Sequence, residues 1–156
     1  MRVHVCAVGR LRSGPERALV NDYLERFNRA GRALALGPVL EHEVEDRKGG
    51  GMAAEAALLA RAIPDGALLV VLDERGQTMP SPAFAGRIAQ WRDEGRADLA
   101  FAIGGADGLD PTLRARAALA LSFGAMVWPH MLVRAMLAEQ LYRAASILSG
   151  GPYHRA

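Results

Sequence analysis

The sequence predicts an α/β protein with a mostly parallel β-sheet flanked by helices. Short apolar runs alternate about five times with longer segments whose apolar residues have helical spacing. Two of the runs, "ALLVVLD" and "DLAFAIGG", are wholly apolar, which is typical of strands buried on both faces of a parallel sheet. Because the chain shows no repeat, low-complexity segment or linker, we expect a single domain over residues 1–156.

The predicted strands follow in order along the chain. Arg2 to Val8 alternates with period two, as a strand does. The second strand region, "ALALGPVLEHEVED", is interrupted by Gly37-Pro38. The two wholly apolar runs supply the third and fourth strands, and "LALS" is a short fifth.

The predicted helices begin with proline or a capping residue and end at glycine. They are "SGPERALVNDYLERFNRAG", "MAAEAALLARAI", "SPAFAGRIAQWRDEG", "DPTLRARA" and "WPHMLVRAMLAEQLYRAASILSGG". The last is apolar over most of its circumference, so it should be buried all round. In a chain of this size a subunit interface would bury it, and the alternative is a central core helix of a monomer.

Composition excludes several classes of protein. Hydrophobic residues make up 51% and charged residues 23%, as in a folded globule. Cys6 is the single cysteine, and no apolar run approaches the roughly 20 residues of a spanning helix, so we expect a cytoplasmic protein without a membrane segment. His4, His42, His130 and His154 lack ligand-like spacing, so no metal is expected. The net charge of +2 is a mild hint of an anionic partner.

Three predicted strand ends are candidates for a ligand site, because ligands of open α/β sheets lie beyond the carboxyl ends of the strands. In "IGGADG", Gly104 and Gly105 would let a ligand approach the backbone, or they form only a tight turn. In "LDERG", the carboxylate of Asp73 could hold a ribose or a cation, or the segment is a solvated turn.

The third strand end, "SFGAMVWPH", is apolar without being helical. Such a loop tends to be buried and must find partners for its backbone groups, which an adenine edge would supply. His130 falls in the first turn of the long helix, where the helix dipole disfavours the imidazolium. It is either a neutral hydrogen-bonding group beside a pocket or a structural histidine.

The segment "SGGPYHRA" follows the long helix. Its glycines and proline end the helix and turn the chain. Tyr153, His154 and Arg155 then offer an aromatic ring, an imidazole and a guanidinium, three groups suited to holding a nucleotide.

Taken together, "LDERG", "FAIGGADG", "WPHMLVRAMLAEQLYRA" and "PYHR" resemble the small SPOUT methyltransferases that modify pseudouridine at N3 in 23S ribosomal RNA. The resemblance covers nearly the whole chain. It implies a SPOUT fold with a C-terminal trefoil knot, a homodimer, and S-adenosylmethionine bound in the knot. It also implies a target in a loop of 23S rRNA on the assembled 70S ribosome, and no metal.

The resemblance also implies roles for particular residues. The cofactor would be held by Leu72, Gly104, Gly105, Phe123, Gly124, Ala125, Met126, Val127 and Trp128. The catalytic residues would be His130, His154 and Arg155, and the target nucleotide would be contacted by Arg134, Tyr153, His154 and Arg155.

The chain departs from the family pattern at three positions. Val127 stands where many relatives have threonine, Met131 replaces a common glutamine, and Gly151 replaces a frequent histidine. Two other functions compete with the enzyme. A non-catalytic ribosome-binding module would not need the glycines of "IGGADG". A nucleotide-binding enzyme acting on small molecules would leave the basic aromatic tail unexplained.

Overall fold

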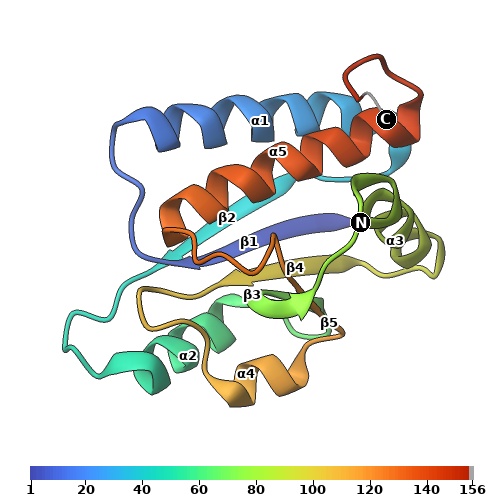
Figure 1. Ribbon diagram of the computed structural model, residues 1–156. Helices are drawn as coiled ribbons and strands as arrows, with labels where there is room; N and C mark the ends of the chain where they lie inside the picture. The colour runs from blue at the N-terminus through green and yellow to red at the C-terminus, as the bar shows by residue number, and fades with distance from the viewer. Residues whose placement is uncertain (155–156) are drawn as a thin grey trace.

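The structure is a computed structural model that describes residues 1–154. Strands and helices alternate along the chain, as predicted (Figure 1). The strands are β1 (Arg2–Val8), β2 (Val39–Val44), β3 (Leu68–Gln77), β4 (Asp98–Ile103) and β5 (Leu119–Leu121). The helices are α1 (Pro15–Gly31), a 3₁₀ turn η1 (Arg32–Leu34), α2 (Gly51–Ala62), α3 (Ser81–Asp93), α4 (Pro111–Arg116) and α5 (His130–Ser149).

The five strands form one sheet in the order β2-β1-β4-β3-β5. Every pair of neighbours is parallel, which confirms the predicted fold class. All five carboxyl ends therefore lie at the same edge of the sheet. The ends of β3, β4 and β5 are adjacent there, because these three strands are neighbours.

Helices cover both faces of the sheet. In Figure 1, α1, α3 and α5 lie on one side and α2 and α4 on the other. The first layer buries a core that includes Phe27, Phe101 and Leu141, each with no exposed side-chain surface. The second, smaller core contains Cys6 and Leu59. Burial raises the pKa of the Cys6 thiol to about 12, which leaves it un-ionised and unsuited to nucleophilic catalysis.

Two predicted boundaries change in the structure. The second strand starts only at Val39, after the Gly37-Pro38 interruption. The third strand does not end at "LDERG" but continues to Gln77, with an irregular register between Leu72 and Gln77. The continuation needs Gly76, because a Cβ at this position would lie 2.5 Å from the carbonyl oxygen of Ala120.

A polar cluster occupies the amino-terminal edge of the sheet. Asp98 accepts hydrogen bonds from Arg2 Nε at 2.8 Å and Nη2 at 3.0 Å, and it lies 2.8 Å from His4 Nε2. The other ring nitrogen of His4 lies 3.0 Å from His42 Nε2. Because His4 and Asp98 are both buried, each depends on the others to replace its contacts with water.

Helix α5 is buried on one side only. Ala135, Leu141 and Ala145 pack inward, while Met131 stays 39% exposed and Met136 is half-buried. The chain alone therefore does not bury the apolar circumference of α5. Burial all round stays a prediction that requires a second subunit, and the trefoil knot also stays a prediction.

Candidate functional site: a cavity at the carboxyl ends of three strands

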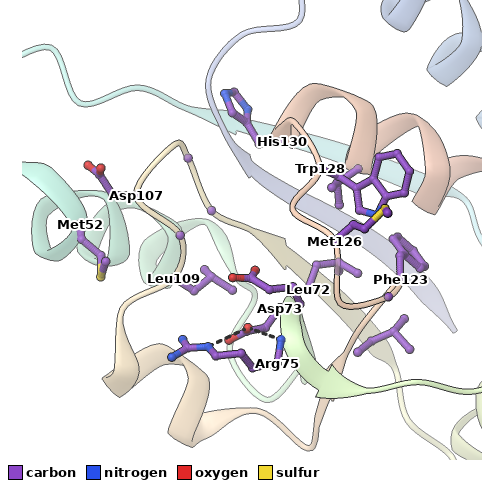
Figure 2. A pocket seen from close by; sticks show the side chains of 17 residues that line it. Met52, Leu72, Asp73, Arg75, Asp107, Leu109, Phe123, Met126, Trp128 and His130 are labelled. Atoms are coloured by element: carbon purple, nitrogen blue, oxygen red, sulfur yellow. Dashed lines mark hydrogen bonds and ion pairs between the residues drawn. The ribbon is translucent and has the colours of Figure 1, made fainter.

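A cavity of about 180 Å³ lies where β3, β4 and β5 end (Figure 2). Its wall comes from the three segments that the sequence singled out, joined by the start of α5 and by Met52 of α2. Eight of the predicted site residues line it: Leu72, Gly104, Gly105, Phe123, Gly124, Met126, Trp128 and His130. Ala125 and Val127 do not line it and are exposed.

The glycine segment after β4 forms a tight turn that also serves as cavity wall. The Gly108 amide donates to the Gly105 carbonyl at 3.0 Å, and the φ of +81° at Gly108 favours glycine. A Cβ on Gly104 would lie 2.5 Å from the Gly108 carbonyl oxygen. The sequence left open whether these glycines form a ligand site or only a tight turn. The two alternatives are compatible, because the tight turn itself forms this wall of the cavity.

The end of β3 is held by a hydrogen bond and ion pairs of the buried Asp73 side chain. The side chain of Asp73 is only 5% exposed and accepts from the Arg75 amide at 2.9 Å, with Arg114 at 3.3 Å. Burial alone would raise the pKa of Asp73, but these hydrogen bonds and the two guanidinium charges outweigh it and hold the pKa below its ordinary value. Asp73 is thus an ionised anchor of the turn beside Leu72, rather than a solvated charge.

The loop after β5 is fixed from inside. Ser122 Oγ lies 3.1 Å from the Glu74 carbonyl oxygen and 3.0 Å from the Gly124 amide nitrogen. Gly124 has φ +120°, which lets the chain turn back toward the cavity. Phe123 and Trp128 then present aromatic rings to the cavity, while Met126 is 74% exposed at its mouth.

His130 lies in the first turn of α5 and lines the cavity. Its Nδ1 is buried and has no hydrogen-bond partner among residues 1–154. Burial, and then the positive charge of Arg134, lower the pKa of His130 below its ordinary value. The ring is therefore neutral at neutral pH, as the sequence predicted for one of its two alternatives. Because a buried N–H without an acceptor is costly, the ring proton is favoured on Nε2.

Arg134 was expected to face a target nucleotide, and in this structure its side chain is 2% exposed. It donates from Nη1 to Glu43 Oε2 at 2.5 Å and from Nη2 to the Gly9 carbonyl at 2.9 Å. The reason is tertiary, since β2 brings two carboxylates, Glu41 and Glu43, under the first turns of α5. In this structure the guanidinium is therefore directed to Glu43 and Gly9, and its contact with a target nucleotide stays a prediction.

The tail is far from the cavity of its own chain. His130 begins α5 and Tyr153 follows its end, so the 20 residues of the helix separate them by about 30 Å. The Tyr153 hydroxyl donates to Glu139 Oε1 at 3.0 Å, and the Arg143 guanidinium lies 5.0 Å from the centre of its ring. His154 Nδ1 is buried without a described partner, and Arg155 lies outside the described residues. Among the described residues, one chain therefore does not bring His130 and His154 together.

Sequence reasoning missed several cavity residues. Asp107 and Leu109 line the wall, and the available signal was their position within and just after the predicted strand end "IGGADG". Met52 gave no such signal, because only the packing of α2 brings it to the opposite side of the cavity.

The described residues contain neither a grouped set of metal ligands nor a membrane-spanning helix. Among residues 1–154, no three histidine, cysteine, aspartate or glutamate side chains are grouped so that they could hold a metal ion. Within the same range, no helix has the length and apolar character needed to cross a membrane.

The fold and the cavity define a class: an α/β protein with a parallel sheet and a ligand site at the carboxyl ends of its strands. The particular family follows from comparison with known proteins. The family model described as "Predicted SPOUT methyltransferase" matches residues 1–154, and the chain belongs to this family.

Named relatives match over almost their full length. The chain is 72% identical to the "Ribosomal RNA large subunit methyltransferase H" of Roseobacter denitrificans and 70% identical to that of Dinoroseobacter shibae. Each match covers 99% of both chains. Among solved structures, a probable methylase family protein from Haemophilus influenzae Rd KW20 has the same fold, with a TM-score of 0.54 and 12% identity. That match covers 99% of this chain and 70% of the other.

Proposed function

We propose that this protein transfers a methyl group from S-adenosylmethionine to N3 of a pseudouridine, in a loop of 23S rRNA on the assembled ribosome in the cytoplasm. The observation that carries the proposal is the cavity itself. Its lining includes seven of the nine positions that the family resemblance assigns to the cofactor: Leu72, Gly104, Gly105, Phe123, Gly124, Met126 and Trp128. The relatives named as methyltransferases of large-subunit rRNA support the class of substrate.

The residues of the cavity suit this cofactor. The apolar side chains of Leu72, Leu109 and Phe123 can pack against the faces of an adenine. The carboxylates of Glu74 and Asp107, also in the wall, favour a ligand with positive charge. When bound, S-adenosylmethionine supplies an electrophilic methyl group on a positively charged sulfur.

His130 is the ionisable side chain of the cavity best suited to stabilise the negative charge that develops on the target base. As N3 of the target base loses its proton to solvent water, negative charge spreads onto the neighbouring carbonyl oxygens. The His130 ring carries its proton on Nε2, because Nδ1 is buried without a described partner. It can therefore donate a hydrogen bond to such an oxygen and stabilise the imidate. His154 is a candidate for proton handling, and Arg155 would stabilise charge.

A second copy of the chain would complete the site. Tyr153 and His154 follow the far end of α5, about 30 Å from the cavity of their own chain, so they can serve a cavity only in a partner subunit. The surface beside the cavity mouth is apolar and uncovered, with Met126 74% exposed and Val127 81% exposed. We propose that a homodimer buries this surface and brings each tail toward the other cavity.

Methylation of ribosomes tests the proposal directly. Purified protein and S-adenosylmethionine are incubated with 70S ribosomes from a strain that lacks the modification, and the rRNA is analysed by mass spectrometry. We expect one added methyl group on a pseudouridine with ribosomes and little with naked 23S rRNA. Absence of the methyl group on ribosomes would refute the proposed reaction. If calorimetry also showed no binding of S-adenosylmethionine, the non-catalytic binding module would be the better description.

A further inference from the structure

An ion-pair network centred on the buried guanidinium of Arg134 joins the first turns of α5 to β2 and α1. Arg134 of α5 contacts Glu43 at 2.5 Å and Glu41 at 3.7 Å, both on β2. Arg17 of α1 reaches the same two carboxylates at 3.2 and 2.8 Å. Glu43 also accepts from the Leu11 amide at 2.7 Å. The network thereby ties α5, β2, α1 and the turn after β1 together.

Gly9 connects this network to His130. Its carbonyl accepts the second hydrogen bond of Arg134 at 2.9 Å, and its amide donates to the Val44 carbonyl at 2.8 Å. A Cβ added to Gly9 would lie 3.4 Å from His130 Cε1, so the ring rests against this turn. The φ of +92° at Gly9 is one that L side chains rarely adopt. Arg134 therefore hydrogen-bonds to the backbone turn beside which the His130 imidazole lies.

The sequence places Arg134 four residues after His130 on α5, so the two side chains lie on one face of the helix. Its guanidinium is a fixed, buried positive charge. The proposed methyl donor also carries a positive charge, on its sulfur. An imidazolium at the wall of the cavity would repel that charge, whereas a neutral ring would not.

We propose that Arg134 is a positioning residue that holds the His130 ring beside Gly9. By keeping this ring neutral, Arg134 also prevents an imidazolium from facing the positively charged sulfur of the ligand. This inference rests on the proposed function, since it takes a sulfonium as the ligand. The lowered pKa of His130, for which burial is the first cause and Arg134 the second, agrees with it.

Charged groups also lie on the other elements around the cavity, including Glu55 of α2 beside Gly105 and Arg114 of α4, which pairs with Asp73. Further groups lie on β2, β3, α1 and the segments after β1 and β4. They are Asp73, Glu74 and Arg75 of β3, Asp107 after β4, Glu41 and Glu43 of β2, Arg17 of α1, and Arg10 in the turn after β1, which pairs with Glu45 at 3.3 Å. Arg134 is the charged group that acts on His130 directly, and Glu43 pairs with Arg134 rather than with the ring.

The test combines two measurements on the whole protein. The pKa of His130 is measured by NMR, with the imidazole signal assigned through His130→Gln, in the native chain and in Arg134→Gln. Binding of S-adenosylmethionine is measured by calorimetry between pH 5 and 8, with S-adenosylhomocysteine as a ligand that lacks the sulfonium charge. In Arg134→Gln we expect the pKa of His130 to rise. The affinity for S-adenosylmethionine should then fall by about tenfold at the acidic end, with a much smaller fall for S-adenosylhomocysteine.

Three further variants separate positioning from folding. Arg17→Gln is the matched control, because it pairs with the same two carboxylates without bonding to Gly9; it should leave the pKa of His130 and the pH profile of binding unchanged. Arg134→Lys keeps the charge and should preserve the low pKa. Arg134→Gln combined with Glu43→Gln removes the charge together with its partner, so it tests the inference even if Arg134→Gln alone does not fold.

The inference is overturned if Arg134→Gln, or the double variant, leaves the pKa of His130 and the pH profile of binding as in the native chain. It is also overturned if Arg17→Gln shifts them equally, since Arg134 would then have only a structural role. The NMR titration needs neither cofactor nor RNA. If the native protein failed to bind S-adenosylmethionine, the proposed function would fail while the effect of Arg134 on His130 could still be measured.

Discussion

Replacing Gly104 by alanine perturbs one wall of the cavity at a single point. The added Cβ would lie 2.5 Å from the Gly108 carbonyl oxygen and 2.7 Å from its carbon, both backbone atoms that cannot rotate away. Gly104 has no left-handed φ, so the strain is purely steric. The turn that carries Leu109 must therefore move by roughly 1 Å to restore ordinary contact.

The magnitude follows from the cost of overpacking. Inserting a methyl group into a closely packed site costs about 1–3 kcal/mol. The turn is part of the cavity wall, so we expect this cost to appear mainly in ligand binding. At 1.4 kcal/mol for each factor of ten, the affinity for S-adenosylmethionine should fall between about fivefold and 150-fold.

Calorimetric titration with S-adenosylmethionine measures this loss, and the urea unfolding midpoint reports stability in parallel. Gly86→Ala is the matched control, because Gly86 lies within α3 and its added Cβ would meet no atom within 4 Å. That variant should bind normally and gain about 0.5–1 kcal/mol of stability. If Gly104→Ala bound the cofactor as tightly as the native chain, the turn would not form the binding wall and our account of the cavity would be wrong.

Three further predictions concern stability and association. The free energy of unfolding should fall as the pH is lowered below about 6.5. Burial and His4 lower the pKa of His42 in the folded chain, so the unfolded chain takes up a proton on His42 at a higher pH than the folded chain does. Arg2 and His4 hold the pKa of Asp98 below 3.8, so its contribution is lost at more acidic pH, and Asp98→Asn should flatten this lower part of a urea-unfolding series. Leu141→Ala should cost about 2–5 kcal/mol in urea unfolding, because the side chain is fully buried between α5 and the sheet; a loss below 1 kcal/mol would contradict this packing. Val127→Asp should weaken dimerisation at least tenfold in analytical ultracentrifugation, whereas Leu40→Asp, on the strand at the opposite edge of the sheet, should not; equal association of both variants with the native chain would argue against the proposed interface.

The position of the cavity could be predicted from the sequence because the strands were expected to be parallel. The runs ending in Leu72 and Gly104 were predicted to be buried strands of a parallel sheet, and "LALS" was predicted to be a short strand. Parallel strands end at the same edge of a sheet. The nearness of these ends then depended only on strand order. The sheet places β4, β3 and β5 side by side, so the three candidate segments meet.

The contacts of Arg134 could not be predicted in this way. The resemblance to the SPOUT methyltransferases implied that Arg134 faces the target nucleotide, and that role stays a prediction. Its actual partners, Glu41 and Glu43, are about 90 residues earlier in the chain on β2. No local pattern predicts that a carboxylate will reach a particular arginine across such a separation, because the meeting depends on how α5 crosses the sheet.

The segment after α5 likewise has features that the sequence predicted and features that only the structure showed. Its residue types pointed to a nucleotide, and the length of α5 already implied a separation of about 30 Å from His130. The direction of that separation and the contact of Tyr153 with Glu139 came only from the packed structure.

The sequence by itself therefore determined the alternation of strands and helices, their parallel arrangement and the three strand ends that form the cavity. These follow from periodicity, glycine and proline, which act over a few residues. Only the tertiary structure decided that Arg134 turns inward to Gly9, that His130 stays neutral beside it, and that the tail lies away from its own cavity. Burial and charge pairing depend on which distant segments meet, and that is a property of the whole fold.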